Sequence, residues 1–366
     1  MPRFPKNLLI IILILCNLQA FAQEKGCFKE TGIGKLELTT DIDFSEYYIF
    51  FLGEFHGVYG VPEIKLSLIK YLNKTYGIRD VFIEAGLGAA WLYNQYLATG
   101  DTTLMYNPSI LYGDKLPNKL MWQNLFEYNK TLKDKIRIHG MDFERIEFLK
   151  VLKILKPKYH TPPTELDSII TYMDTVNIGS KPQLHSDVFK TQNEIYEHLR
   201  TSFSTHENTF KEFYGANFKT VKSILTNKDT YNNFAIRDKT MFENVTEQTK
   251  EEGITKYIIF SGLNHGKSAY SIHRSLCYRL GKKRHNKIAN ISMICQNCYD
   301  WQARPTLLPY RAQYTYVKDS TTLSQLYKTH FSAGCKYTLL PSTITDNESI
   351  NSNSNFILLM KDQPEY

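Results

Sequence analysis

Two segments that lie far apart in the chain have the same form, an apolar strand followed by a Gly-x-x-His turn. Residues 47–52 lead into Gly53-Glu54-Phe55-His56, and residues 257–260 lead, after one serine, into Gly262-Leu263-Asn264-His265. In α/β proteins, reactive side chains are placed where parallel strands end, at the carboxyl edge of the sheet. The two turns therefore predict one sheet that holds both strands and presents a histidine at the end of each.

The first turn leads into a helix and a second strand. Pro62 marks the start of the helix, its apolar residues recur on one face, and Gly77 marks its end. A short strand at residues 81–83 follows and closes on Glu84. Two strands joined by a single helix form a right-handed βαβ unit and run parallel, so we expect His56 and Glu84 at the same edge of the sheet.

The rest of the chain predicts more strands and a helical insertion. Strands are indicated at residues 136–139, 288–294 and 356–360, whereas residues 23–45 are expected to form an irregular lead-in. Residues 146–253 carry almost no strand signal, and their periodic apolar residues predict four or five helices. We therefore predict an α/β fold with a mainly parallel sheet flanked by helices, and a helical insertion or cap over its carboxyl edge.

Residues 1–22 have the layout of a secretory signal peptide. Arg3 and Lys6 precede an apolar stretch, and Ala20-Phe21-Ala22 offers a cleavage site. The apolar run is shorter than the roughly 20 residues that span a bilayer. We therefore expect an exported protein, periplasmic or secreted, in which residues 23–366 form a single domain with no stable membrane span.

Charge and composition limit the expected partners. The formal net charge is +7, and loss of the signal peptide would lower it to about +5. The one dense basic run, Lys282-Lys283-Arg284-His285, has no interleaved aromatic residues and is typical of a solvated loop rather than a nucleic-acid surface. The chain also has no Gly-x-Ser-x-Gly or phosphate-binding glycine motif. We expect a small-molecule substrate and no nucleic acid.

Five cysteines remain after the expected cleavage, so at least one is free unless it joins another chain. Cys295-x-x-Cys298 has the spacing of a redox pair or of half a zinc site. It opens no helix, however, and no second Cys-x-x-Cys completes a ligand set. A structural disulfide or plain burial is the favoured interpretation.

Ionisable side chains follow several predicted strand ends or lie on the last helix of the cap. A single Glu-x-His is more often a surface pair, but several strand ends that carry such groups to one edge indicate an active site. Asp142, Glu144 and Arg237 are the candidates for substrate binding. The full set is Glu54, His56, Glu84, Asp142, Glu144, Arg237 and His265.

Two kinds of chemistry suit these residues. In one, a histidine held by a carboxylate removes a proton from water, the water attacks an ester or amide carbonyl, and Arg237 with the second histidine stabilises the developing charge. In the other, His56, His265 and Glu54 bind a divalent metal that lowers the pKa of the water. Spacing alone does not decide between them.

The order of motifs resembles the erythromycin esterase and haem-uptake (ChaN-like) superfamily, which also includes Tiki-type and pheromone-shutdown-type metallopeptidases. The resemblance covers most of residues 47–270. It rests on Leu52-Gly53-Glu54-Phe55-His56-Gly57, Ile83-Glu84-Ala85-Gly86, Ile138-His139-Gly140-Met141-Asp142, Arg237-Asp238-Lys239-Thr240-Met241 with Asn244, and the strand that ends at His265.

The resemblance implies a catalytic cluster of Glu54, His56, Glu84 and His265, with His56 as general base and Arg237 at the border of the pocket. Compared with the esterases, the chain has one residue fewer between its first glutamate and histidine, which is the spacing of the haem-uptake and metallopeptidase branches. The favoured hypothesis is an exported ester or amide hydrolase with no cofactor. The alternatives are a haem- or iron-binding protein and a metal-dependent peptidase.

Overall fold

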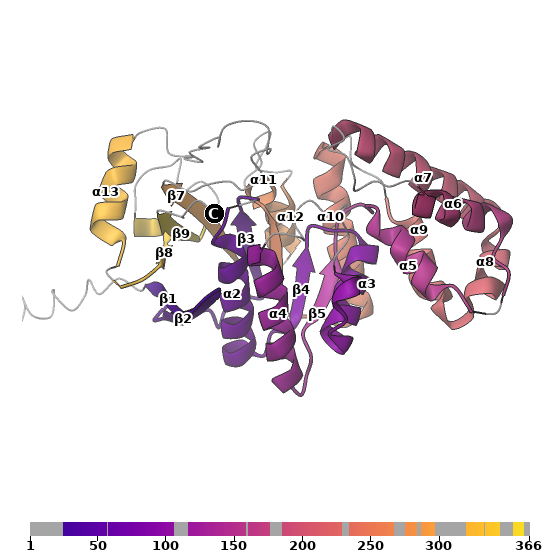
Figure 1. Ribbon diagram of the computed structural model, residues 1–366. Coiled ribbons are helices and arrows are strands. Elements are labelled where there is room, and N and C mark those ends of the chain that lie inside the picture. Colours follow the sequence, from indigo (N-terminus) through magenta and orange to yellow (C-terminus); the bar gives the residue numbers. More distant parts are fainter. Residues whose placement is uncertain are drawn as a thin grey trace, which may run out of the picture.

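The computed structural model describes residues 25–361, except residues 57, 106–115, 159, 176–184, 229–233, 267–274, 284–286, 297–319, 333 and 345–353. Its centre is one nine-stranded sheet of order β2-β1-β8-β9-β7-β3-β6-β4-β5, with helices on both faces (Figure 1). The strands are β1 (Gly26–Gly32), β2 (Lys35–Thr40), β3 (Ile49–Glu54), β4 (Asp80–Ile83), β5 (Arg137–Gly140), β6 (Tyr257–Gly262), β7 (Ile288–Gln296), β8 (Tyr337–Pro341) and β9 (Phe356–Lys361).

The sheet is parallel through its middle and antiparallel at one end. From β9 through β7, β3, β6 and β4 to β5, every neighbouring pair is parallel, whereas β1 pairs antiparallel with β2 and β8, and β8 with β9. The prediction of a mainly parallel α/β sheet is confirmed. The strand β6, which comes late in the chain, lies between β3 and β4, so the carboxyl ends of these three strands are neighbours.

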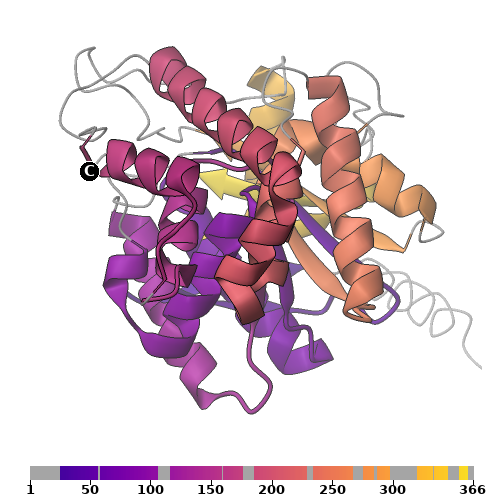
Figure 2. The ribbon, with the colours of Figure 1, turned by 90° about the vertical axis from the view of Figure 1, so that its right-hand side faces the viewer.

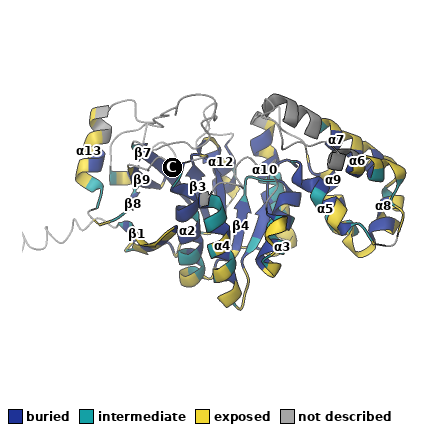
Figure 3. Cartoon of the chain, in the orientation of Figure 1, coloured by how far each residue is buried: buried dark blue, intermediate teal, exposed yellow. Residues whose placement is uncertain are grey.

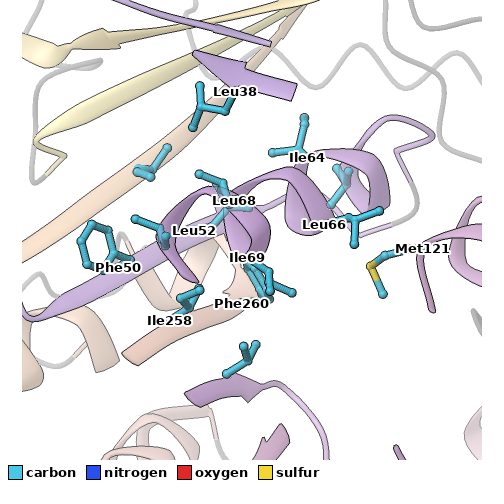
Figure 4. Packing of buried hydrophobic residues seen from close by; sticks show 14 of the residues in the cluster. Leu38, Phe50, Leu52, Ile64, Leu66, Leu68, Ile69, Met121, Ile258 and Phe260 are labelled. Atoms are coloured by element: carbon cyan, nitrogen blue, oxygen red, sulfur yellow. The ribbon is translucent and has the colours of Figure 1, made fainter. Parts of the chain in front are cut away.

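Alternate residues of the central strands pack on opposite faces. Phe50 and Leu52 of β3 lie in one apolar cluster with α2 (Val61–Tyr76) and α4 (Leu116–Thr131), part of which Figure 4 shows. Phe51 packs with α10 (Phe234–Glu251) and α12 (Leu276–Lys283) on the other face. Burying each such side chain contributes about 1.5–3 kcal/mol, and the central strands β3 and β4 are mostly buried in Figure 3. This two-sided burial explains the continuous apolar runs of the sequence.

The helix α2 begins and ends as its sequence predicts. Pro62 lies in its first turn, where the missing backbone N–H costs nothing. Gly77 ends it in the left-handed conformation, with φ of 68°, and its N–H bonds to carbonyls of the last turn. Glycine is favoured there because it has no Cβ to clash at positive φ. The helix thus begins shortly after the turn that carries His56 and ends before β4.

Most of the helices between β5 and β6 form a separate unit with its own apolar core. They stand beside the β5 end of the sheet, toward the carboxyl ends of the strands (Figures 1 and 2). Leu92 of α3 (Leu87–Thr99) also packs in this core and joins the unit to the sheet. The last helix before β6, α10, instead covers the sheet itself. The unit comprises α5 (Glu147–Leu155), α6 (Thr164–Thr175), α7 (His185–Thr205), α8 (Glu207–Tyr214) and α9 (Phe218–Thr226).

The expectation of an irregular lead-in at residues 23–45 is wrong. This part of the chain forms the hairpin β1–β2, and β1 also pairs with β8, a strand that was not predicted from the sequence. The disulfide Cys27–Cys335 joins the two regions. Most side chains of β1 and β2 are exposed lysine, glutamate and threonine, so these strands lack the continuous apolar run that marks a buried strand.

Two further sequence predictions concern the amino-terminal signal peptide and the state of the cysteines. The predicted signal peptide, residues 1–22, lies outside the described residues, and none of the described helices is long and apolar enough to cross a bilayer. Cys277 is a buried free thiol, and Cys295 is disulfide-bonded. Its sequence neighbour Cys298 lies outside the described residues.

Candidate active site

The carboxyl ends of β3, β6 and β4 bring the central candidates together. Glu54 is the last residue of β3, and His56 follows it in the turn. Glu84 directly follows β4, and its N–H donates to the carbonyl of Phe260 in β6. His265 lies in the short helix α11 (Leu263–Gly266), which continues from β6. Three strands that are distant in sequence therefore deliver these four side chains to one place.

His56 lies between two carboxylates. Its Nδ1 is 3.1 Å from Oε1 of Glu54, and its Nε2 is 3.4 Å from Oε2 of Glu84. Its side chain is 42% exposed, whereas both glutamates are buried. Although burial opposes the charged form, Glu84 and Glu54 raise the pKa of His56 to about 9. His56 is thus a solvent-reachable imidazole that the two acids hold by both ring nitrogens.

Glu84 is the centre of the cluster. Besides His56, its carboxylate accepts from the Ser261 hydroxyl at 3.0 Å and the Gly262 N–H at 2.6 Å. Its other oxygen lies 2.5 Å from Nη2 of Arg237 and 3.5 Å from Nε2 of His265. Burial opposes ionisation, but these cations hold the pKa of Glu84 well below its usual value. Glu84 therefore stays negatively charged at any ordinary pH.

His265 is the buried counterpart of His56. Its Nε2 faces Glu84, and its Nδ1 is hydrogen-bonded to Asp238. The side chain is only 5% exposed, and despite this burial the carboxylates of Glu84 and Asp238 raise the pKa of His265 to about 10. His265 thus contacts the cluster through Glu84 and not through solvent. Asp238 was missed as a site residue, although its place beside Arg237 on one helix was the available signal.

Arg237, on α10, links this helix to the residues that follow β4 and β5. Its Nε and Nη2 donate to the two oxygens of Asp142, at 2.9 and 2.5 Å, while Nη2 also reaches Glu84. Asp142 is fully buried, and the Arg237 guanidinium lies 5.2 Å from the ring centre of Phe143. A bidentate guanidinium–carboxylate pair fixes orientation as well as charge. Asp142 and Arg237 therefore position Glu84.

Lys65, on the second turn of α2, is a further residue of the cluster, and it was not predicted from the sequence. Its ammonium group pairs with Oε2 of Glu54 and lies 5.5 Å from the ring centre of Phe260. Against the effect of burial, Lys65 and His56 hold the pKa of Glu54 below its usual value. Glu54 is thereby kept charged beside Nδ1 of His56. No motif surrounds this lysine, so only the helix geometry reveals it.

Gly262 lets the strand end approach the histidine. A Cβ at this position would lie 2.9 Å from Nε2 of His56 and 3.4 Å from Oε2 of Glu84. The glycine of the second Gly-x-x-His turn is therefore required for space. It allows a backbone N–H and an imidazole to contact the same carboxylate.

Glu144 has a different environment from the other candidates. Its carboxylate accepts from the N–H groups of Leu87 and Gly88, at 2.7 and 3.0 Å, and from the side-chain amide of Asn227 at 2.8 Å. It thus caps the amino end of α3. Burial raises the pKa of Glu144 to about 7. The structure does not bring this carboxylate into contact with the cluster around Glu84.

The residues do not fit a metal held by His56, His265 and Glu54. One oxygen of Glu54 pairs with Lys65, and both ring nitrogens of each histidine face carboxylates. Two cations, Lys65 and Arg237, already neutralise the acids on which a metal would depend. Within the described ranges, no group of three or more His, Cys, Asp or Glu is arranged to hold a metal ion.

A groove of about 700 Å³ opens elsewhere, beside the edge strand β5. It lies between α3, α9 and α10, and its lining includes Arg137, Asn227 and Asn244 but none of the acids and imidazoles around Glu84. Asn244 and Asn227 donate to the carbonyls of Met141 and Asp142, respectively. The groove is thus separated from the cluster by the loop that follows β5.

Comparison with known proteins identifies the fold. No protein-family model and no curated protein sequence matches the chain. Among solved structures, a mutant of an erythromycin esterase, EreC, in its open conformation is similar, with 13% identity, 87% of this chain and 91% of the other covered, and a TM-score of 0.55. A succinoglycan biosynthesis protein shares 15% identity over 87% of this chain and 88% of its own, with a TM-score of 0.51.

A haem-bound ChaN of Campylobacter jejuni shares 14% identity over 74% of this chain and 91% of its own. Its TM-score of 0.29 is too low to support an argument. The likeness to the esterase structure supports the fold that the sequence resemblance implies. At such identities it shows the fold alone, and the chemistry must be argued from the site.

Proposed function

We propose that this protein hydrolyses an ester or amide with a water molecule activated at His56. The observation that carries the proposal is the position of His56, exposed on one side and held by Glu54 and Glu84 on the other. A general base must reach both solvent and substrate, and its orientation must be fixed. Among the described members of the cluster, His56 meets both conditions and the buried His265 does not.

The roles of the acids follow from their contacts. Glu54 accepts a hydrogen bond from Nδ1–H of His56, which fixes that tautomer and leaves Nε2 as the basic nitrogen. Glu84, which stays charged, stabilises the imidazolium that forms when Nε2 takes a proton from water. The proton then passes from Nε2 to the departing alcohol or amine. Arg237 and His265 are buried against Glu84 and act as positioning residues.

The two carboxylates keep His56 protonated in the free protein at neutral pH. Because the pKa of His56 is raised to about 9, only a minority of molecules carry the basic form at pH 7. Glu84 is held in place, but a bound substrate that moves the partly exposed ring of His56 away from it would lengthen the 3.4 Å contact of Nε2 and favour loss of that proton. The proposal therefore implies an enzyme that works best in alkaline solution.

The test is hydrolysis of 4-nitrophenyl esters and amino-acid 4-nitroanilides by the mature protein at pH 9. We expect turnover that His56→Ala lowers about 10²–10⁴-fold, the usual effect of removing a general base. His198→Ala is the matched control because it removes an exposed imidazole from α7. Absence of hydrolysis across the panel, or full activity of His56→Ala, would contradict the proposal.

The haem and metal alternatives have less support from the site. The exposed His56 could serve as a ligand, but His265 is buried with both nitrogens engaged. Adding haem and recording a Soret band, with His56→Ala as comparison, tests the binding hypothesis. Metal analysis with assays before and after a chelator tests the peptidase hypothesis.

We also propose that the protein is exported. The signal-peptide pattern of residues 1–22 supports this, and so does the disulfide between Cys27 and Cys335. Structural disulfides persist mainly in oxidising compartments. Fractionation of cells and mass measurement of the mature amino terminus would test export and cleavage after Ala22.

A further inference from the structure

A second arginine packs on the same aromatic ring as Arg237, in the loop that follows β5. Arg145 follows Asp142 and Phe143 in the loop before α5, and its side chain is partly exposed. Its guanidinium carbon lies 5.3 Å from the ring centre of Phe143, whose ring also lies 5.2 Å from the guanidinium of Arg237. One aromatic ring is therefore shared by a guanidinium of the cluster and by Arg145.

Unlike the cations of the cluster around Glu84, Arg145 contacts no carboxylate among the described residues. Lys65, His56, His265 and Arg237 each contact at least one carboxylate. Within the part of the chain that the structure describes, the side chain of Arg145 makes no ion pair or hydrogen bond, and its Nε is buried without a partner. A guanidinium with five N–H donors is costly to leave unmatched when it is partly buried.

The acid that interacts electrostatically with Arg145 compensates for this only in part. Glu147, in the first turn of α5, is buried and within electrostatic range of Arg145, but the two form no ion pair among the described contacts. Burial raises the pKa of Glu147 despite the charge of Arg145, and one of its oxygens also has no hydrogen-bond partner. The positive charge of Arg145 is therefore only weakly offset.

We propose that Arg145 binds an oxyanion of the substrate, a carboxylate or phosphate, and so makes the site selective for anionic esters or amides. The planar guanidinium fork matches such groups through two parallel hydrogen bonds. The charges of the Glu84 cluster are already matched, so an incoming anion is drawn to Arg145 and not to the catalytic residues. This selectivity rests on the proposed hydrolase function, whereas anion binding itself does not.

The binding test uses calorimetric titration of the mature protein with glutarate and, separately, with inorganic phosphate. We expect at least one of them to bind, and Arg145→Gln to weaken that binding tenfold or more. Arg145→Lys keeps the positive charge but lacks the planar guanidinium. Its affinity for the anion should lie between the affinities of the wild type and of Arg145→Gln. Arg79→Gln is the control because it removes an exposed guanidinium remote from the site. Equal affinity of the wild type and Arg145→Gln, or no binding by the wild type, would overturn the proposal.

The activity test compares 4-nitrophenyl acetate with mono-4-nitrophenyl glutarate. Arg145→Gln should raise KM for the charged ester about ten- to hundredfold, with kcat and both constants for the acetate ester little changed. If the variant treats the two esters as the wild type does while His56→Ala is inactive, the hydrolase proposal stands and the Arg145 proposal fails. If no ester is cleaved but anion binding depends on Arg145, the reverse holds.

Discussion

Nη2 of Arg237 lies 2.5 Å from Oε1 of Glu84, although 153 residues separate the two in the sequence. The same guanidinium is bidentate on Asp142. These contacts leave little freedom to the carboxylate that faces both histidines. The arrangement explains why Glu84 can be charged, buried and correctly oriented at once.

Removing Arg237 should therefore destabilise the fold. Arg237→Met leaves Glu84 and Asp142 buried without their counter-ion, and we expect the free energy of unfolding to fall by about 3–5 kcal/mol. Urea denaturation followed by circular dichroism measures the change. Arg79→Met, at an exposed pair, should have almost no effect. A loss below about 1 kcal/mol for Arg237→Met would show that the ion pairs of Arg237 with Glu84 and Asp142 contribute little to stability.

The activity should depend on pH through His56. A general base works unprotonated, and the pKa of His56 is raised to about 9, so kcat/KM should rise with pH and level off above that value. Glu84→Gln removes the principal charge that raises this pKa and should move the midpoint of the profile to lower pH. Initial rates between about pH 6 and pH 10.5 measure both profiles. A rate that falls across this range would instead assign His56 as an acid.

The stability of the protein should fall in alkaline solution through His265. Its pKa is raised from 6.5 to about 10 in the folded protein, so its contribution is complete below pH 6.5 and is lost as the pH rises to 10. The loss follows because the folded protein binds the His265 proton more tightly than the unfolded chain does. His265→Gln should flatten this part of the profile of the free energy of unfolding against pH, which urea denaturation at a series of pH values measures. Parallel wild-type and variant profiles would contradict the assignment.

Glu144 should prove to be structural. Glu144→Ala leaves the N–H groups of Leu87 and Gly88 without their acceptor and should lower the free energy of unfolding by about 1–3 kcal/mol. The KM of the residual folded enzyme should not change, because the carboxylate does not contact the cluster. A raised KM with unchanged stability would instead support the prediction of substrate binding made from the sequence.

The disulfide should stabilise the antiparallel end of the sheet. Cys27 and Cys335 are 308 residues apart in sequence, so their bond closes a very long loop. The double variant Cys27→Ser/Cys335→Ser should lose about 2–5 kcal/mol of unfolding free energy. Chemical denaturation of the oxidised wild type and the oxidised double variant measures this, with Cys277→Ser as a control that removes no bond. Equal stability of the wild type and the double variant would contradict the expected role.

The sequence predicts the strand-end residues of the cluster well, because a buried strand is a continuous apolar run that stops where its polar turn begins. Glu54, Glu84 and His265 were found in this way. Lys65 and Asp238 were not, since they reach the site from helices, where side-chain direction depends on how the helix packs. Asp142 and Glu144 look alike in sequence, and only the structure separates a partner of Arg237 from a helix cap.

The hairpin β1–β2 shows the opposite difficulty. It lies at the edge of the sheet with most of its side chains exposed, so its residues carry little apolar pattern. The hairpin joins the sheet because β1 pairs with β8, which is far away in sequence, and the disulfide Cys27–Cys335 links the two regions. Such a pairing depends on tertiary contacts that local sequence does not encode.

The insertion of β6 between β3 and β4 has a consequence for synthesis of the protein. A ribosome releases Glu54, His56 and Glu84 long before the chain that fills the gap between their strands. Until β6 arrives, Glu84 lacks Ser261, Gly262 and His265, and the central sheet has no continuous row of backbone hydrogen bonds. The nascent amino-terminal half therefore holds open strand edges, and the cluster can assemble only as a late event in folding.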